Sequence, residues 1–84
     1  MISINDVREL LKGIGSLAEV ADHLSEDDDL FEKGLDSFSS VQLMLALEEK
    51  FDFEFPDHLL NRRSFSTIRI IRETVAALTV PAAA

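Results

Sequence analysis

Apolar side chains recur at helical spacing along most of the chain, starting close to its N-terminus. In the first stretch they fall three or four positions apart: Ile4, Val7, Leu10, Leu11, Ile14 and Leu17. This period places them on one face of a helix, and Ser3 with Asp6 is a typical N-terminal capping pair. The pattern predicts a first helix over residues 4–17, whose later turns are weakened by Gly13 and Gly15.

The longest uninterrupted helix pattern is SFSSVQLMLALEEKF, which contains no glycine or proline and is rich in strong helix formers. It predicts a second helix over residues 37–51, with Asp36 or Ser37 as its N-cap. Residues 18–36 then form a long polar loop. Loops of this length are usually functional or carry a short turn of their own.

The segment after residue 51, FDFEFPD, alternates apolar and polar residues as a strand does, but no second strand is indicated with which it would pair. Pro56 and Asp57 instead predict the start of a short helix over residues 57–62.

The last helix is predicted from a repeat of apolar residues on one face: Ile68, Ile71, Val75 and Leu78. It is expected over residues 66–79, capped by Ser64 or Ser66, and is followed by a tail at 80–84. The chain, 1–84, is therefore expected to be a single all-α domain. We predict a small four-helix bundle with up-down topology and a short third helix.

The predicted helix 37–51 carries two apolar stripes. One contains Leu43, Leu47 and Phe51 with Met44 beside them, and it can pack against the other helices. The second contains Phe38, Val41 and Leu45. Either the helix is central and buried on most sides, or the second stripe is a docking surface for a partner. The pattern alone leaves both interpretations open.

Charge is distributed unevenly, and this excludes some partners. The net charge is −8, but residues 19–57 hold thirteen Asp and Glu against two Lys. Such an acidic body repels nucleic-acid phosphates and anionic membranes and attracts basic protein surfaces. We expect neither nucleic acid nor membrane as a partner. The last third carries most of the arginines, Arg62, Arg63, Arg69 and Arg72, which form either a solvated face or a partner contact.

The chain has no cysteine, so it supplies no disulfide, thiolate ligand or thiol nucleophile of its own. It shows neither the basic and apolar start of a signal peptide nor 18 consecutive apolar residues. We expect a cytoplasmic monomer.

Ser37 is the candidate for chemistry, because free amides and the helix dipole at a helix start favour an anionic group. Nothing activates it as a nucleophile: the histidines are His23 and His58, and no catalytic triad can be assembled. The chain is therefore not expected to be an enzyme. Acidic residues 26–29 lack the spacing of a calcium loop, which favours a solvated loop over a metal site.

The stretch Gly34, Leu35, Asp36, Ser37, Phe38, followed by VQLMLALEEKFDFEFPD, resembles the acyl carrier protein family. In that family a Gly-x-Asp-Ser-Leu motif opens the second of four helices, and the similarity here extends from about residue 27 to 75. The resemblance implies that Ser37 receives a 4'-phosphopantetheine arm from coenzyme A through a phosphopantetheinyl transferase. Asp36 would either cap the helix or help that enzyme and its magnesium engage the serine.

The resemblance also implies a partner surface on the second stripe, made of Phe38, Val41, Gln42, Leu45, Glu48 and Glu49. Phe38 stands where the family usually has leucine, and Gln42 where an acid is common. The chain looks most similar to small bacterial carriers outside fatty-acid synthesis, some of which are charged with amino acids. The implied partners are thus an ATP-dependent acyl or aminoacyl ligase and downstream acyl-transfer enzymes.

The expected function is that of a discrete carrier, which holds a small acyl or aminoacyl thioester on its arm. The side chains predicted between the second and last helices are all large: Met44, Leu47, Phe55, Phe65, Ile68 and Ile71. They predict a filled interior without space for a long acyl chain. The alternative is a helical adaptor without a prosthetic group, in which Ser37 is only a cap.

Overall fold

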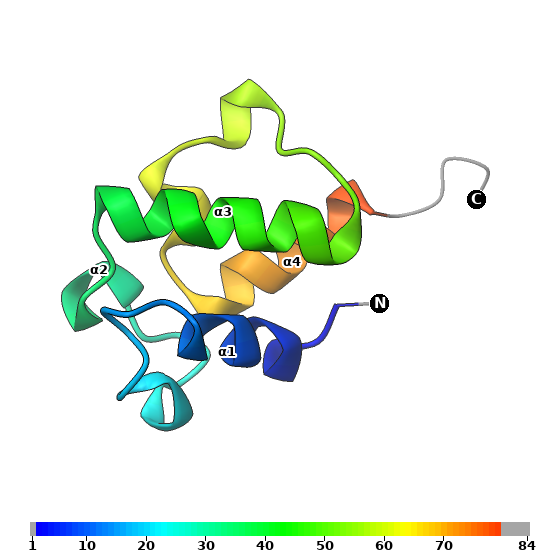
Figure 1. Cartoon of the computed structure of the whole chain (residues 1–84). Coiled ribbons are helices and arrows are strands. Elements are labelled where there is room, and N and C mark those ends of the chain that lie inside the picture. The colour runs from blue at the N-terminus through cyan, green and yellow to red at the C-terminus, as the bar shows by residue number, and fades with distance from the viewer. Residues whose placement is uncertain (1, 80–84) are drawn as a thin grey trace.

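The computed structural model describes residues 2–79, and the regular structure within them is entirely helical (Figure 1). The α-helices are α1 (Ile4–Lys12), α2 (Leu30–Lys33), α3 (Ser37–Phe51) and α4 (Ile68–Leu78). Three 3-10 turns connect them: η1 (Ala21–His23), η2 (Asp57–Leu59) and η3 (Arg62–Phe65). The predicted all-α fold class is confirmed.

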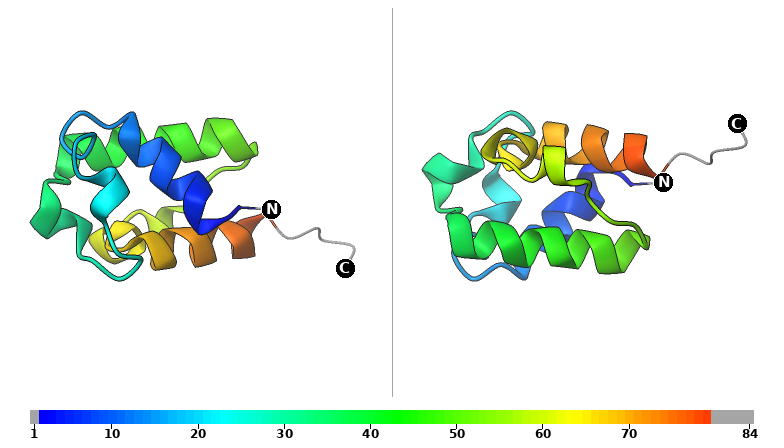
Figure 2. Two further views of the ribbon diagram at one scale, coloured as in Figure 1. Left: turned by 90° about the horizontal axis from the view of Figure 1, so that it is seen from below. Right: turned by 90° about the horizontal axis from the view of Figure 1, so that it is seen from above.

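The three longer helices enclose one core. α1 runs antiparallel to α3, and residues 52–67 carry the chain back so that α4 runs parallel to α3 (Figures 1 and 2). α1 contacts both α3 and α4. The fully buried side chains of these helices are Val7, Leu11, Leu43, Leu47, Ile68, Ile71 and Val75. Because they come from the predicted core stripes, the helical period identified the inner face of each helix.

α3 covers the predicted range, and its N-terminus is fixed by a capping box. The Asp36 carboxylate accepts from the Ser39 backbone N–H at 2.8 Å, and the Ser39 hydroxyl accepts from the Asp36 N–H at 2.9 Å. Asp36 is therefore the N-cap, and Ser37 is the first residue inside the helix. The interpretation of Ser37 as the helix cap is wrong.

The first helix ends at Lys12, so the prediction that it reaches residue 17 is wrong. Gly13 is its C-cap and donates its N–H to the Leu10 carbonyl at 3.0 Å. Successive turns then follow, with Ile14 N bonded to Leu11 O at 3.0 Å and Leu17 N to Ile14 O at 2.9 Å. These turns bury Ile14 and Leu17 without an α-helix. The apolar spacing in the sequence therefore continues beyond the end of α1.

The predicted loop 18–36 contains η1 and α2 and is tied to the helices on both sides. Arg8 of α1 donates through Nη1 to the carbonyls of Ala21 at 2.8 Å and Leu24 at 2.6 Å. Arg69 of α4 holds the acidic stretch, with its Nε 2.8 Å from the Asp27 carboxylate. The loop is therefore ordered by contacts with α1 and α4.

The short helix predicted over 57–62 is wrong, because residues 57–59 form one 3-10 turn, η2, and a second turn, η3, begins only at Arg62. Asn61 adopts an extended backbone, with φ −143° and ψ 168°, and its side chain caps η3 by accepting from Ser64 N at 3.0 Å. The extended backbone at Asn61 thus separates η2 from η3.

The last helix begins at Ile68 and not at residue 66, because Thr67 and neither Ser64 nor Ser66 is its N-cap. The Thr67 hydroxyl accepts from the Ile70 N–H at 3.0 Å. The helix ends at Leu78, and the predicted tail 80–84 lies outside the described residues. Within residues 2–79, none of the helices is both long and apolar enough to pass through a bilayer.

Candidate functional site

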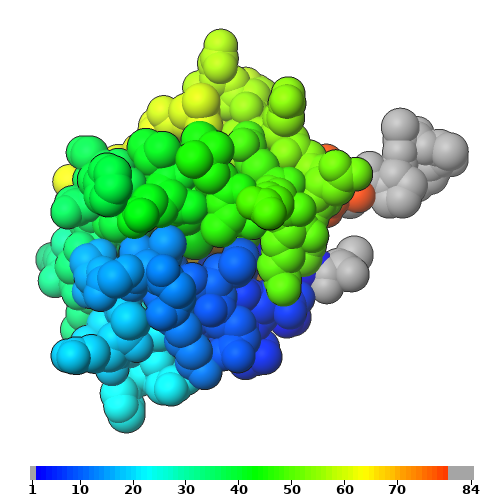
Figure 3. All heavy atoms as spheres, in the orientation of Figure 1, coloured from blue at the N-terminus to red at the C-terminus, as the bar shows by residue number. Residues whose placement is uncertain are grey.

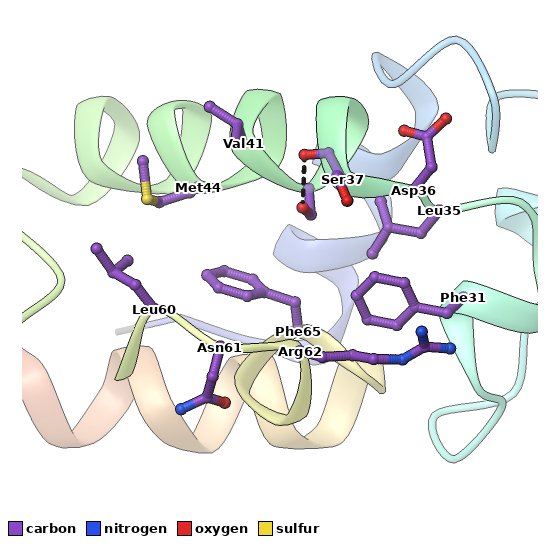
Figure 4. A pocket seen from close by; sticks show the side chains of 11 residues that line it. Phe31, Leu35, Asp36, Ser37, Val41, Met44, Leu60, Asn61, Arg62 and Phe65 are labelled. Carbon is purple, nitrogen blue, oxygen red and sulfur yellow. Dashed lines mark hydrogen bonds between the residues drawn. The ribbon is translucent and has the colours of Figure 1, made fainter. Parts of the chain in front are cut away.

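Ser37 lies exposed at the first turn of α3. Its backbone carbonyl accepts a hydrogen bond from the Ser40 hydroxyl at 2.9 Å (Figure 4), but its own hydroxyl bonds to none of residues 2–79. The capping of α3 is already performed by Asp36. The Ser37 hydroxyl is therefore accessible and is not needed to hold the helix.

Asp36, the neighbour of Ser37, is held ionised by the same capping box. The backbone N–H of Ser39 and then the Ser39 hydroxyl donate to its carboxylate, which lowers the pKa of Asp36 below its usual value. Ser39 itself is almost fully buried, which keeps these donors in place. A carboxylate with fixed charge and orientation thus lies beside the exposed hydroxyl.

An open groove of about 660 Å³ begins at Ser37 and runs between α3 and the η2–η3 segment (Figure 4). This volume is in the range of about 300–1,000 Å³ typical of small-molecule sites. Its apolar lining comes from α2, the turn after it, α3 and the segment around η3: Phe31, Leu35, Val41, Met44, Leu60 and Phe65. The sequence does not predict this groove, because its walls come from segments far apart in the chain.

The second stripe of α3 is exposed. Phe38 is 74%, Val41 49% and Leu45 54% accessible, while Leu43 and Leu47 on the core stripe are fully buried. α1 lies along one edge of α3 and residues 52–65 along the other, which leaves the outward face of α3 uncovered (Figure 3). The interpretation of α3 as a helix buried on most sides is therefore wrong.

The polar residues predicted beside this stripe differ in their surroundings. Gln42 and Glu49 are exposed. Glu48 is half-buried, and its carboxylate accepts from the Phe55 N–H at 2.9 Å, which ties the chain after α3 back to the helix. Glu48 thus has a role within the fold that the sequence did not indicate.

The acidic residues 26–29 are engaged in local structure. Glu26 and Asp27 pair with Arg69, Asp28 accepts from Ser25 N, and Asp29 caps α2. In the part of the chain that the structure describes, no three His, Cys, Asp or Glu residues are grouped as metal ligands.

Comparison with known proteins assigns the family. The sequence model of the phosphopantetheine attachment site matches residues 5–78. The chain belongs to this family. It is 52% identical over 69 residues to the aminoacyl carrier protein of Agrobacterium fabrum, covering 82% of this chain and 83% of that protein. It is 42% identical over 53 residues to the D-alanyl carrier protein of Lactobacillus acidophilus, covering 62% of this chain and 67% of the relative.

One similar solved structure is a crystal structure of engineered Bradyrhizobium japonicum glycine:[carrier protein] ligase complexed with carrier protein from Agrobacterium tumefaciens and ATP. The matched chain superposes with a TM-score of 0.81 at 49% identity, covering 89% of this chain and 99% of that one. The small helical bundle described above is therefore the fold of known carrier proteins.

Membership of this family makes the chain a carrier protein with a covalent 4'-phosphopantetheine group, and not an enzyme. The residues present fit such a group. Ser37 offers an exposed hydroxyl without a hydrogen bond to the described residues, and the groove beside it is open along its length. The adaptor alternative, in which the domain lacks a prosthetic group, is wrong.

Proposed function

We propose that the arm is attached to Ser37 and that this carrier protein is charged with a small amino acid by an ATP-dependent ligase. The observation that carries the proposal is the unused Ser37 hydroxyl at the start of α3, where Asp36 already caps the helix. The resemblance of residues 34–38 to the family motif, in which the serine at the helix start is modified, supports the same choice.

When bound, the group supplies a thiol, which holds the cargo as a thioester and compensates for the absence of cysteine in the chain. The chain itself holds the attachment point. The rigid turn between Leu35 and Ser39 presents the hydroxyl outward, and the free N–H groups at the start of α3 favour a phosphodiester there. We also propose that Asp36, ionised and adjacent, helps the phosphopantetheinyl transferase and its magnesium engage Ser37.

An aminoacyl cargo is supported by the relatives, which are named aminoacyl and D-alanyl carrier proteins, and by the glycine:[carrier protein] ligase in the similar complex. A small cargo also agrees with the packing of the core in this chain. Leu47, Ile68 and Ile71 are completely or almost completely buried, as expected of a packed core. Met44 and Phe65, which were also expected to fill this region, instead line the open groove. A small cargo needs no room in that interior.

The exposed stripe of α3 is the proposed docking surface, formed by Phe38, Val41, Gln42, Leu45 and Glu49, with Glu48 at its edge. Its apolar centre and acidic border match an enzyme surface with an apolar patch and basic rim. The proposed partners are the transferase, the ligase and downstream acyl-transfer enzymes. Each must reach the arm, and the stripe begins one residue after Ser37.

The test is a mass spectrum of the protein after incubation with coenzyme A and a promiscuous phosphopantetheinyl transferase. Wild type and Ser40→Ala are expected to gain one arm, and Ser37→Ala none. Addition of ATP, glycine and a glycine:[carrier protein] ligase should then add one glycyl group. An arm on Ser37→Ala, located by peptide mapping at Ser39 or Ser40, would refute the attachment site. A normal arm that accepts no amino acid from such ligases would refute the cargo.

A further inference from the structure

Arg62 occupies an unusual position on the wall of the groove that begins at Ser37. Its guanidinium carbon lies 4.3 Å from the centre of the Phe31 ring, and Arg62 and Ser37 line the same groove (Figure 4). Phe31 belongs to α2 and Arg62 to η3, so the contact joins two segments across the end of the groove. The aromatic ring thereby orients the cation on the wall of the groove that begins at Ser37.

Three of the other cations are engaged by oxygen atoms, whereas four of them form no salt bridge or side-chain hydrogen bond within residues 2–79: Lys33, Lys50, Arg63 and Arg72. Arg69 pairs with Asp27, Lys12 with Glu9 and Asp22, and Arg8 donates to two carbonyls. Within residues 2–79, Arg62 forms neither a salt bridge nor a side-chain hydrogen bond. A cation–π contact uses the face of the guanidinium and leaves its N–H donors available. Arg62 is therefore oriented and still able to bind an anion.

The free N–H groups at the start of α3 supply only part of the positive charge around Ser37. Asp36 places an ionised carboxylate next to Ser37, and two amides of the first turn are already used: Ser39 N bonds to the Asp36 carboxylate and Ser40 N to the Asp36 carbonyl at 2.8 Å. A phosphodiester on Ser37 adds a further negative charge to this corner. A cation from the facing wall would offset both charges.

We propose that Arg62 binds the phosphodiester oxygens of the arm on Ser37 and so directs the arm along the groove toward Met44 and Leu60. The inference rests on the proposed attachment at Ser37. A planar guanidinium with several donors suits two phosphate oxygens at once, which a lysine ammonium does not. Arg62 is thus a positioning residue, and the groove is the path of the arm in the carrier when no enzyme is bound.

The first experiment compares the unmodified and arm-bearing proteins by NMR with arginine side chains labelled. The Nε–H signal of Arg62 is expected to shift when the arm is added, and that of its exposed neighbour Arg63, which does not line the groove, to stay in place. At about 1 M salt the Debye length is only about 3 Å, so the shift should become smaller. An unchanged Arg62 signal would overturn the proposal without requiring any variant.

The second experiment measures the 31P signal of the arm in Arg62→Gln and in the matched control Arg63→Gln, which removes the same charge one position away. We expect a changed shift and a narrower line only for Arg62→Gln, with partial recovery in Arg62→Lys. If both glutamine variants give the wild-type 31P signal while Arg62→Gln lowers the melting temperature, Arg62 only braces Phe31 and the proposal fails.

A mass spectrum recorded first separates this inference from the function on which it rests. If the arm is on Ser37 but the Arg62 Nε–H signal does not change, only the proposed role of Arg62 is contradicted. An arm found elsewhere, or none at all, contradicts the attachment at Ser37 and the role of Arg62 with it.

Discussion

A β-carbon on Gly34 would lie 2.9 Å from the carbonyl oxygen of Ser16. Gly34 also has a φ of 129°, a conformation that other residues rarely adopt. This close approach packs the end of α2 against the turns that follow α1. It fixes where the chain enters α3, and therefore where Ser37 stands.

Gly34→Ala is expected to lower the free energy of unfolding by about 1–3 kcal/mol, because it combines backbone strain with a contact that the backbone of Ser16 must relieve. The matched control is Gly15→Ala, since a β-carbon there meets nothing within 4 Å. Urea unfolding of both variants provides the measurement. Equal stability of Gly34→Ala and Gly15→Ala would show that the approach to Ser16 is not constrained.

The two stripes of α3 should respond oppositely to substitution. Leu45 lies on the exposed stripe, so Leu45→Arg is expected to change the melting temperature little. It should weaken the binding free energy between carrier and ligase by up to a few kcal/mol, as for an interface anchor, and so slow loading. Val41→Asp should act in the same way. The measurements are thermal unfolding and the rate of ligase-catalysed loading at limiting carrier concentration.

Leu47→Ala, on the buried stripe, is the control, and it should lower the free energy of unfolding by about 2–5 kcal/mol because it leaves a cavity in the core. If Leu45→Arg unfolded the domain while Leu47→Ala did not, the assignment of core and docking stripes would be reversed.

The sequence predicted α3 well because local signals agree there: Asp36 is a strong cap, no breaker follows, and apolar residues recur on the inner face. Elsewhere, apolar spacing overstated the length of regular structure. Ile14 and Leu17 are buried by turns, and their spacing resembles that of a helix. Asn61 was expected inside the short helix over residues 57–62, but it is the N-cap of a new turn.

The candidate site was predictable only in part, for a physical reason. The motif around Ser37 is contiguous, so sequence reasoning found it. The groove and the contact of Arg62 with Phe31 join residues about thirty positions apart, and nothing local in the sequence indicates that they meet. The hydrogen bond from Phe55 N to Glu48 is likewise a product of the turn after α3.

Asp36 should make stability depend on pH in the acid range. The Ser39 donors lower the pKa of Asp36 in the folded state. The ionised cap therefore stabilises the fold fully at pH values above the unfolded pKa of about 3.9. This stabilisation is lost as the pH falls through the lower pKa of the folded state. Asp36→Asn retains an oxygen that can cap the helix but does not titrate in this range. The difference in melting temperature between wild type and Asp36→Asn should therefore shrink below about pH 4. A difference that stays constant between neutral pH and the acid limb would contradict the role of the ionised cap.

The packed core predicts how the carrier treats a long acyl chain. Leu47 of α3 and Ile68 and Ile71 of α4 are buried in the core, and inserting a chain among closely packed side chains costs about 1–3 kcal/mol or more. Half-buried Met44 and exposed Leu60, by contrast, lie on the open groove.

An octanoyl group on the arm is therefore expected to shift the methyl signals of Met44 and Leu60 but not those of Ile68 and Ile71, and to leave the melting temperature near that of the unloaded form. The glycyl form is the control, and it should leave the methyl signals of Ile68 and Ile71 unchanged because so small a cargo needs no space in the core. Large shifts at Ile68 and Ile71, together with a marked rise in melting temperature for the octanoyl form, would mean that the core opens to admit the chain. Side-chain volume would then give no reason to expect a small cargo, because a carrier that shelters a long chain between α3 and α4 has no structural preference for an amino acid.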